Sequence, residues 1–267
     1  MEYSDNEFRQ TVWEYYRVNA RSMPWRDDPT FYYVLVSEIM LQQTQVSRVI
    51  VKFAEFINQF PTIKLLADVP LREVLTAWQG LGYNRRAKFL HEAARHVKHS
   101  GEPTTRSGLM ALPGVGQNTA GAMMNYVYEQ PTPYVETNIR TVFFHHFFID
   151  HKGAVHDNEL MPHVARTLSH DNPREWFWAL MDYGSWLKAQ GVARNHMSRH
   201  HKKQPALAGS LREMRSAVIR ALAAQDETER SLCSMFADDE RLEPALQSLV
   251  RDGLIQRRNG RVYLTKT

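Results

Sequence analysis

The sequence is poor in cysteine and has no long apolar run. Cys233 is its one cysteine, so it cannot form an internal disulfide or supply a cysteine-ligated zinc or iron–sulfur site alone. No window reaches about 18 uncharged apolar residues, and the first residues are charged throughout, which argues against a membrane-spanning helix and a signal peptide. We therefore expect a cytoplasmic protein without membrane contact.

Internal repeats, low-complexity tracts and a strong charge imbalance are missing as well. With 43% hydrophobic and 23% charged residues, the composition argues against a disordered, collagen-like or disulfide-stapled protein. The net charge of +4 and the pI of about 9.1 permit an anionic partner without proving one. At about 150 residues per domain, the 267 residues predict one to three domains.

Apolar spacing, together with proline and glycine, predicts an almost entirely helical chain. The expected helices cover residues 5–20, two stretches within 31–60, then 71–77, 85–97, both sides of a turn at 112–116, 137–148, 158–169, 174–188, 211–224, 231–237 and 243–252. Asn259-Gly260 between two short strand-like runs predicts a β-hairpin. Three helices followed by a hairpin are typical of a winged helix-turn-helix.

Two segments carry the clearest chemical signals. The turn Leu112–Gly116 leads into a helix near Gln117, and a helix N-terminus beside glycines is a ready phosphate site. Glu136 precedes another helix, with Thr137 and Asn138 as capping candidates, and its simplest interpretation is a favourable interaction with the helix dipole.

Three motifs in order then identify a resemblance: Val36–Val46 (VSEIMLQQTQV), Trp78–Tyr83 (WQGLGY) and Leu112–Gly116 (LPGVG). The chain resembles the helix-hairpin-helix DNA glycosylases with a Gly/Pro-rich loop and a catalytic aspartate, and within them the MutY-like adenine glycosylases. The resemblance extends from about residue 8 to about residue 186. It implies an all-α, two-lobed core over residues 1–188. A six-helix lobe would span about 30–135 with its hairpin at 109–128, and the second lobe would combine 1–28 with 137–188. A basic linker at 189–209 and a winged helix at 210–267 would follow.

The resemblance implies two catalytic carboxylates. Glu38 would be the general acid that protonates the departing base and then helps to activate water, and Glu136 stands where the family has its aspartate. Removing a base from deoxyribose needs a proton on the base and negative charge near C1′, which suits two carboxylates in different environments. The alternative for Glu38 is a buried, hydrogen-bonded structural glutamate. Asn118 lies where strand-cutting relatives carry a Schiff-base lysine, so we expect no β-lyase activity.

The same resemblance places further residues on the nucleic acid. Trp25, Arg26 and Asn118 would line the base pocket, the alternative being a core tryptophan beside a surface arginine. Gln43 and Tyr83 would enter the duplex, although Tyr83 could also be an ordinary core aromatic. The other expected DNA contacts, some of them to phosphates, are Gln42, Arg85, Arg86, Leu112, Gly114, Val115, Gly116, Gln117 and Thr119.

The sequence departs from the family in two regions. The positions of the family's four iron–sulfur cysteines fall on Lys188, Asn195, Ser198 and Gln204. We therefore expect no iron–sulfur cluster and no other cofactor. A Na⁺ or K⁺ ion bound at the hairpin remains an alternative. For the basic stretch with His196, His200, His201, Lys202 and Lys203 we favour a phosphate-facing loop over a replacement metal site. A winged helix replaces the domain that inspects 8-oxoguanine, and Asn84 replaces a usual second tyrosine.

The expected function is a monomeric, monofunctional base-excision DNA glycosylase, a hydrolase of N-glycosyl bonds. Its substrate would be double-stranded DNA with adenine opposite 8-oxoguanine or guanine. The departures leave two alternatives open: another target, such as thymine or uracil opposite guanine or an alkylated base, and a DNA-binding protein with a decayed glycosylase site. A helical enzyme without a nucleic-acid role ranks last, because it leaves Gln42, Gln43 and the glycine turn unexplained.

Overall fold

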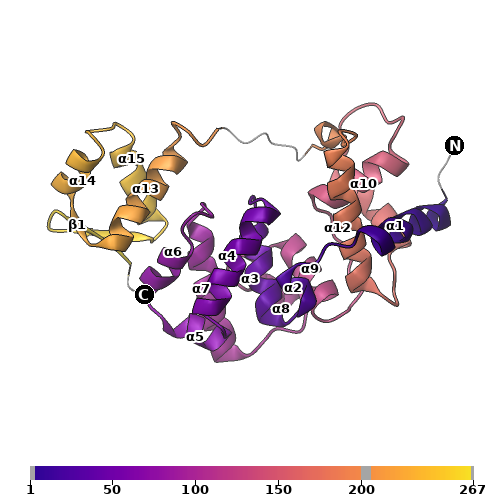
Figure 1. Cartoon of the computed structure of the whole chain (residues 1–267), viewed down its shortest axis with the longest axis horizontal. Coiled ribbons are helices and arrows are strands. Elements are labelled where there is room, and N and C mark those ends of the chain that lie inside the picture. Colours follow the sequence, from indigo (N-terminus) through magenta and orange to yellow (C-terminus); the bar gives the residue numbers. More distant parts are fainter. Residues whose placement is uncertain (1–3, 200–205, 266–267) are drawn as a thin grey trace. The chain divides into compact units, whose positions relative to one another are not determined.

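A computed structural model describes residues 4–199 and 206–265 of the chain (Figure 1). Helices dominate them, as the sequence predicts. Their bounds are α1 (Asp5–Asn19), α2 (Pro24–Asp27), α3 (Phe31–Leu41), α4 (Val46–Gln59), α5 (Ile63–Asp68), α6 (Leu71–Ala77), α7 (Arg85–Ser100), α8 (Arg106–Met110), α9 (Gln117–Tyr126), α10 (Thr137–Phe147), α11 (Asp157–Thr167), α12 (Pro173–Ala189), the short 3₁₀ helix η1 (Asn195–Met197), α13 (Leu211–Ala224), α14 (Glu229–Met235) and α15 (Leu242–Arg251). None of the helices in these two ranges is long and apolar enough to cross a bilayer.

Local signals explain where the helices begin. Ser4 caps α1 in a reciprocal capping box with Glu7, and the side chain of Ser210 accepts the Glu213 N–H at the start of α13. Proline stands at the first position of α2 and of α12, where its missing N–H costs no helical hydrogen bond. The predicted bounds of α6 and α13 coincide with the observed ones.

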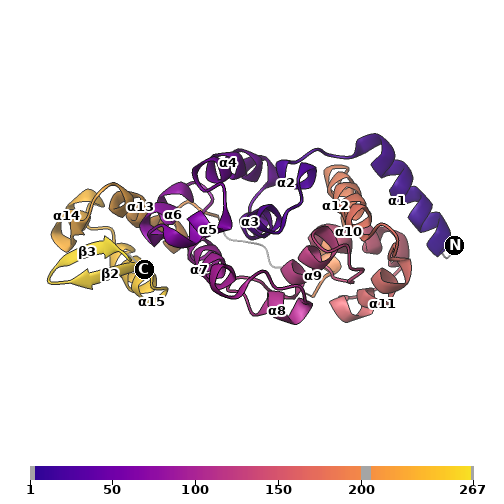
Figure 2. The same ribbon diagram turned by 90° about the horizontal axis from the view of Figure 1, so that it is seen from below.

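The C-terminal residues form the expected winged helix. Strands β2 (Ile255–Arg258) and β3 (Arg261–Leu264) pair antiparallel, and Asn259 and Gly260 between them have φ of 51° and 70°, as a type I′ turn requires. The short strand β1 (Glu227–Thr228), which we did not predict, pairs with the other side of β3, giving the order β1-β3-β2. Figure 2 shows this hairpin beside α14 and α15.

The chain packs into two compact units. The first contains the described residues of Met1–Val34, Pro103–Ala111 and Val115–Lys203, and the second those of Leu35–Glu102, Leu112–Gly114 and Gln204–Thr267. This grouping differs from the predicted lobes because α9, which the sequence placed with α3–α7, packs with α12 in the first unit, and α8 packs on α9. The winged helix joins the second unit, where α13 packs on α6.

The first unit encloses an aromatic core. The Phe8 ring of α1 lies 5.1 Å from that of Phe143 on α10 and 6.0 Å from that of Trp176 on α12, and all three side chains are buried. Aromatic pairs at these separations add to the stabilisation that burial itself provides. The helices α1, α10 and α12 therefore form a rigid frame on which polar side chains can be positioned.

Candidate active site

Glu38 is the single charged residue of α3. Its neighbours in the helix from Val34 to Met40 are all buried, whereas Glu38 retains partial access to solvent. A carboxylate on an otherwise buried helix is costly unless it has a partner or a use, and Glu38 does interact with other described residues. The structure thus places this carboxylate at the accessible edge of a rigid apolar helix, as a general acid requires.

Glu136 caps α10 with its own side chain. Its Oε1 accepts hydrogen bonds from the backbone N–H of Asn138 at 2.5 Å and of Ile139 at 2.9 Å. Burial raises the pKa of the Glu136 carboxyl, and the two amides and the charges of Lys188 and Arg140 oppose that rise. The residue as a whole keeps partial access to solvent, while its carboxylate is poorly hydrated.

Contacts before and after Glu136 fix the position of its carboxylate. Asn125, which is fully buried, donates to the Thr132 carbonyl at 2.8 Å and accepts the Thr132 N–H, which pins the loop leading to α10. The Tyr134 ring stacks on Phe177 with centroids 4.6 Å apart. A Cβ at Gly184 would lie 2.3 Å from the Asn138 carbonyl oxygen, so only glycine lets α12 approach the first turn of α10 this closely.

A buried ion cluster holds the segment that contains Trp25. Asp182 on α12 accepts from both terminal nitrogens of Arg26 at 2.9 Å and from Arg21 Nε at 2.8 Å. Trp25 is buried, and the Arg26 guanidinium lies 5.3 Å from the ring centroid of Trp178. The guanidinium of Arg26 is therefore already bound, and its evident role is to position α2 rather than to face solvent. The base-pocket roles of Trp25 and Arg26 remain predictions.

The glycine turn between α8 and α9 is shaped by close packing. Gly114 has φ of +80°, which favours glycine, and a Cβ there would lie 2.9 Å from Cβ of Phe89. The backbone conformation and the lack of room for a side chain therefore both require glycine. Gln42 Nε2 donates to the Gly114 carbonyl at 3.1 Å, which joins the end of α3 to the turn. The structure brings these two predicted DNA-contact residues together.

The same turn divides into buried and accessible residues. The side chains of Leu112, Val115 and Thr119 are buried, so they can contact a ligand through backbone groups only. Gly116, Gln117 and Asn118 are exposed, and no side chain caps α9. The first N–H groups of α9 thus lie at an accessible helix N-terminus, which is the arrangement that binds phosphate.

Gln43 and Tyr83 lie in two turns with unusual backbone geometry. Both have positive φ, 59° and 47°, which costs free energy in a residue other than glycine. Gln43 is exposed and Tyr83 half-buried. Such conformations persist where the surroundings enforce them and concentrate at ligand-contact sites.

Arg86 holds both turns in place, and its guanidinium, which we expected to pair with phosphate, is bound to groups of the protein instead. Its side chain is 7% exposed, and its guanidinium donates to the carbonyls of Ile39, Met40, Gln42, Leu81 and Gly82 and to Thr44 Oγ1. Burial lowers the pKa of Arg86 to about 10, which leaves it charged at neutral pH. The charge is used inside the protein, because it satisfies carbonyls that two non-helical turns leave unpaired.

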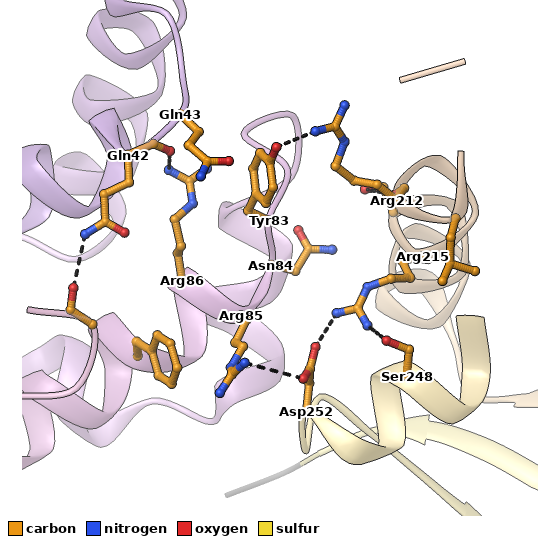
Figure 3. Close-up of a pocket in the computed structure, with 14 residues that line it drawn as sticks. Gln42, Gln43, Tyr83, Asn84, Arg85, Arg86, Arg212, Arg215, Ser248 and Asp252 are labelled. Atoms are coloured by element: carbon orange, nitrogen blue, oxygen red, sulfur yellow. Dashed lines mark hydrogen bonds and ion pairs between the residues drawn. The ribbon is translucent and has the colours of Figure 1, made fainter. Parts of the chain in front are cut away.

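Two hollows flank Tyr83 within the second unit. The larger, about 560 Å³, lies between the Gln42–Gln43 and Tyr83 turns on one side and α13 and α15 on the other (Figure 3). Arg212 on α13 donates to the Tyr83 hydroxyl, and its guanidinium lies 5.1 Å from the Tyr83 ring centroid. Arg85 is exposed and lies 3.9 Å from Asp252, so it can still meet a phosphate.

Comparisons with known proteins decide the family. The HhH-GPD superfamily model of base excision DNA repair proteins matches residues 36–164. An adenine DNA glycosylase of Mycobacterium tuberculosis is 31% identical over 269 residues, covering 91% of this chain and 88% of that protein. The chain belongs to the MutY-like family of the HhH-GPD superfamily.

Other relatives match this MutY-like chain over a shorter region. An adenine DNA glycosylase of Buchnera aphidicola (Schizaphis graminum strain) is 37% identical over 146 residues, which cover 53% of this chain and 42% of that protein. This chain thus spans about half of the length of the Buchnera relatives that it matches. Among solved structures, a thermostable thymine-DNA glycosylase gives a TM-score of 0.62 at 22% identity, covering 72% of this chain and 91% of the other, and confirms the all-α glycosylase fold.

Hydrogen bonds hold the segment around residues 195–198, where the family has cluster cysteines and this sequence has none. Thr141 Oγ1 donates to Asn195 Oδ1 at 3.0 Å, and Val155 forms a parallel bridge with Ser198. Lys188, Asn195 and Ser198 offer an amine, an amide and a hydroxyl but no thiolate, so these donors do not fit an iron–sulfur cluster. Gln204, His200, His201, Lys202 and Lys203 lie outside the described residues. Within the described ranges no group of histidine, cysteine and acidic side chains could hold a metal.

Sequence reasoning missed three residues that hold candidate site residues in place: Asn125 and Asp182 in the first unit, and Arg212 in the second. Asp182 gave a signal, since it is an acidic residue within the apolar run of α12 and such residues are rarely buried without a partner. Asn125 and Arg212 gave none, because their partners become neighbours only when the chain has folded.

Proposed function

We propose that this protein is a monofunctional DNA glycosylase that hydrolyses the N-glycosidic bond of adenine opposite 8-oxoguanine or guanine. Membership of the MutY-like family and the names of the curated relatives support the reaction and the base. The observation that carries the proposal is Glu136, whose carboxylate caps α10 in poorly hydrated surroundings that oppose its charge. A carboxylate in such surroundings is strongly attracted to a developing cation.

The reaction follows from the two carboxylates. The adenine leaves the duplex and Glu38 donates a proton to it, so that the bond between the base and C1′ can break with the electron pair departing on the base. Ionised Glu136 stabilises the positive charge that develops on the sugar. Water then adds to C1′ and gives its proton to the Glu38 carboxylate, which leaves an abasic site and restores Glu38.

The DNA backbone stays intact in this proposal. Strand cleavage by a lyase needs an amine that forms a Schiff base with C1′, and Asn118 offers an amide at that position. The exposed N-terminus of α9 and the turn before it would bind phosphate. We further propose that the enzyme acts on double-stranded DNA as a monomer and without a redox cofactor.

The first test is a single-turnover excision assay with and without alkali. Duplexes would carry adenine opposite 8-oxoguanine or guanine, thymine or uracil opposite guanine, hypoxanthine, or an alkylated base. We expect cutting of an adenine duplex only after alkali, and rates lower by about 100-fold or more in Glu38→Gln and Glu136→Gln. Borohydride should trap no covalent complex.

Matched controls separate catalysis from folding. Glu159→Gln also alters a carboxylate that accepts a backbone N–H at a helix start, and Glu55→Gln alters an exposed glutamate of the second unit. Both should keep the wild-type rate. Excision of another base would reassign the substrate. A wild-type protein that binds these duplexes and cuts none of them would favour the decayed-site alternative, and a trapped complex would overturn the monofunctional assignment.

A further inference from the structure

The winged helix faces the turns that we expect to contact DNA. Tyr83, which we expect to enter the duplex, points toward α13 and accepts a hydrogen bond from Arg212 (Figure 3). Arg85, at the start of α7, lies 3.9 Å from the Asp252 carboxylate at the end of α15. Gln43 lines the hollows on both sides of Tyr83, and residues of α13 form another wall of each. The side chains expected on DNA in these turns therefore lie against the winged helix.

The space between these turns and the winged helix is too small for a double helix. The larger hollow has a volume of about 560 Å³, and the smaller, which extends toward Arg48 and Arg220, about 420 Å³. Hollows of this size hold a small ligand, whereas the major groove of B-form DNA alone is about 12 Å wide. A duplex that receives the side chains of Gln43 and Tyr83 would therefore occupy the same space as α13.

Asp252 supplies anionic contacts to α7 that phosphates would otherwise make. Its carboxylate pairs with Arg85, and its backbone carbonyl accepts a hydrogen bond from Lys88 Nζ at 3.0 Å. Within the winged helix, the same carboxylate accepts from Arg215 at 2.5 Å, which fixes its orientation. Carboxylate and phosphate oxygens are interchangeable partners of a guanidinium. Asp252 thus competes with DNA for Arg85.

A second polar contact holds the winged helix on α6. Arg72 pairs with Asp226 at 2.8 Å and donates to the Leu222 carbonyl at 3.1 Å. The two side chains of this ion pair are 32% and 42% exposed. Ion pairs this accessible to water are individually weak. A polyanion such as DNA can therefore compete with contacts of this kind.

The helix with which a winged helix usually reads DNA is poorly suited to that task here. Residues at the start of such a helix contact base edges in a major groove. In α15, the third helix, exposed Glu243 occupies this position and accepts from Gln247 and from Arg257 of β2. Asp238 and Glu240, in the turn before α15, are exposed as well. This end of α15 would therefore bring negative charge to the phosphates that border the groove.

We propose that the docked winged helix is an autoinhibitory cover over the DNA-contacting turns of the second unit. In the closed state Arg212 holds the Tyr83 hydroxyl. Asp252 holds Arg85 in the same state. Duplex DNA replaces both contacts, and the winged helix leaves α6 and α7 while it stays attached through the chain. Because only open molecules bind, the apparent affinity for every duplex is reduced in proportion to the open fraction. This proposal rests on the proposed duplex contacts and on no particular target base.

A variant that loosens the docking should bind DNA more tightly. Fluorescence anisotropy would measure the affinity of the full chain for an undamaged duplex and for one with a tetrahydrofuran abasic-site analogue. Lys88→Met removes the donor to the Asp252 carbonyl and should tighten binding to both duplexes by about 5- to 10-fold. Removing a cation ordinarily weakens binding to DNA, so the sign of this change is diagnostic.

An acidic pair of variants separates docking from overall charge. Asp226→Asn removes the partner of Arg72 and should tighten binding by about two- to fivefold. Asp238→Asn removes the same charge from an exposed position of the winged helix that makes no ion pair with the described residues. This matched control should change the affinity by less than about twofold. Equal effects of the two variants would contradict the proposal.

A covalent lock provides the converse test. In a Cys233→Ser background, which removes the native cysteine, Arg72→Cys and Asp226→Cys place thiols on both sides of the docking contact. A bismaleimide with a reducible bond should join them and lower the affinity for both duplexes by about 10-fold or more, and reduction of the linker should restore it. Thiols that cannot be joined, a locked protein that binds as the unlocked one does, or weaker binding by Lys88→Met would overturn the proposal. Since no base is excised in these assays, their failure is distinguishable from a failure of excision.

Discussion

At the scale of single residues, Glu136 occupies a position that opposes its own charge. Burial is the largest influence on its carboxyl and raises the pKa above the ordinary value of 4.5, while two backbone amides and Lys188 favour ionisation. The family aspartate is one methylene shorter, and the longer side chain here still reaches the first turn of α10. Because stabilising a sugar cation needs the ionised form, the pH range of activity should report on these contacts.

We expect the excision rate to fall on the acid side of its pH profile at a pH above the ordinary pKa of a glutamate. Lys188→Met removes a charge that lowers the pKa of Glu136, so it should move this limb to higher pH. Single-turnover rates measured across pH would show the shift, with Lys98→Met on α7 as the control. An unchanged limb in Lys188→Met would contradict the coupling.

The same raised pKa determines how stability depends on pH. A carboxyl whose pKa is higher in the folded state contributes stability below its unfolded value, and this contribution is lost as pH rises through the folded value. Glu136→Gln should therefore melt above the wild type at neutral pH, and the difference should vanish below about pH 4.5.

At the scale of elements, α12 determines the position of the first turn of α10. Asp182 on α12 binds Arg21 and Arg26, and Gly184 two residues later touches the Asn138 backbone. One helix thus orders the Trp25 segment and the turn that carries Glu136.

Gly184→Ala should be strongly destabilising because the new methyl group would collide with a backbone oxygen that cannot rotate away. We expect a loss of about 1–3 kcal/mol in the free energy of unfolding in urea, together with a lower excision rate. Ser185→Ala on the same helix is the matched control. A Gly184→Ala variant with wild-type stability and rate would show that α12 does not determine this position.

At the scale of the whole molecule, the sequence predicted elements better than their association. The starts of α6 and α13 and the Asn259-Gly260 turn depend on neighbours in the chain, and these predictions are confirmed. The packing of α9 with α12 and the docking of α13 on α6 depend on contacts between distant residues. The burial of Arg86 was not predicted for the same reason. Its carbonyl partners Ile39 and Met40 are distant in sequence, and a run of charged residues is usually exposed to solvent.

The docking of the winged helix in the second unit depends on Lys88. Its amine donates to the Asp252 carbonyl at the end of α15, where a cation also favours the helix dipole, and Gly253 leaves room for it. Lys88→Met should cost the winged helix about 1.5–3 kcal/mol. Hydrogen exchange should accelerate in α13 and α15 but not in α1 or α12, and uniform acceleration would contradict this local role.

Arg86 has a consequence for the entropy of recognition. The Arg86 guanidinium donates to the carbonyl before Gln43 and to the two carbonyls before Tyr83. The backbone positions of Gln43 and Tyr83 are therefore fixed relative to each other. Their backbone freedom is lost when the protein folds rather than when a ligand arrives, and preorganisation of this kind lowers the entropic cost of binding. A distorted duplex would then meet Gln43 and Tyr83 at a spacing that folding has already fixed. A ligand that contacts only one of these two side chains would gain little binding free energy.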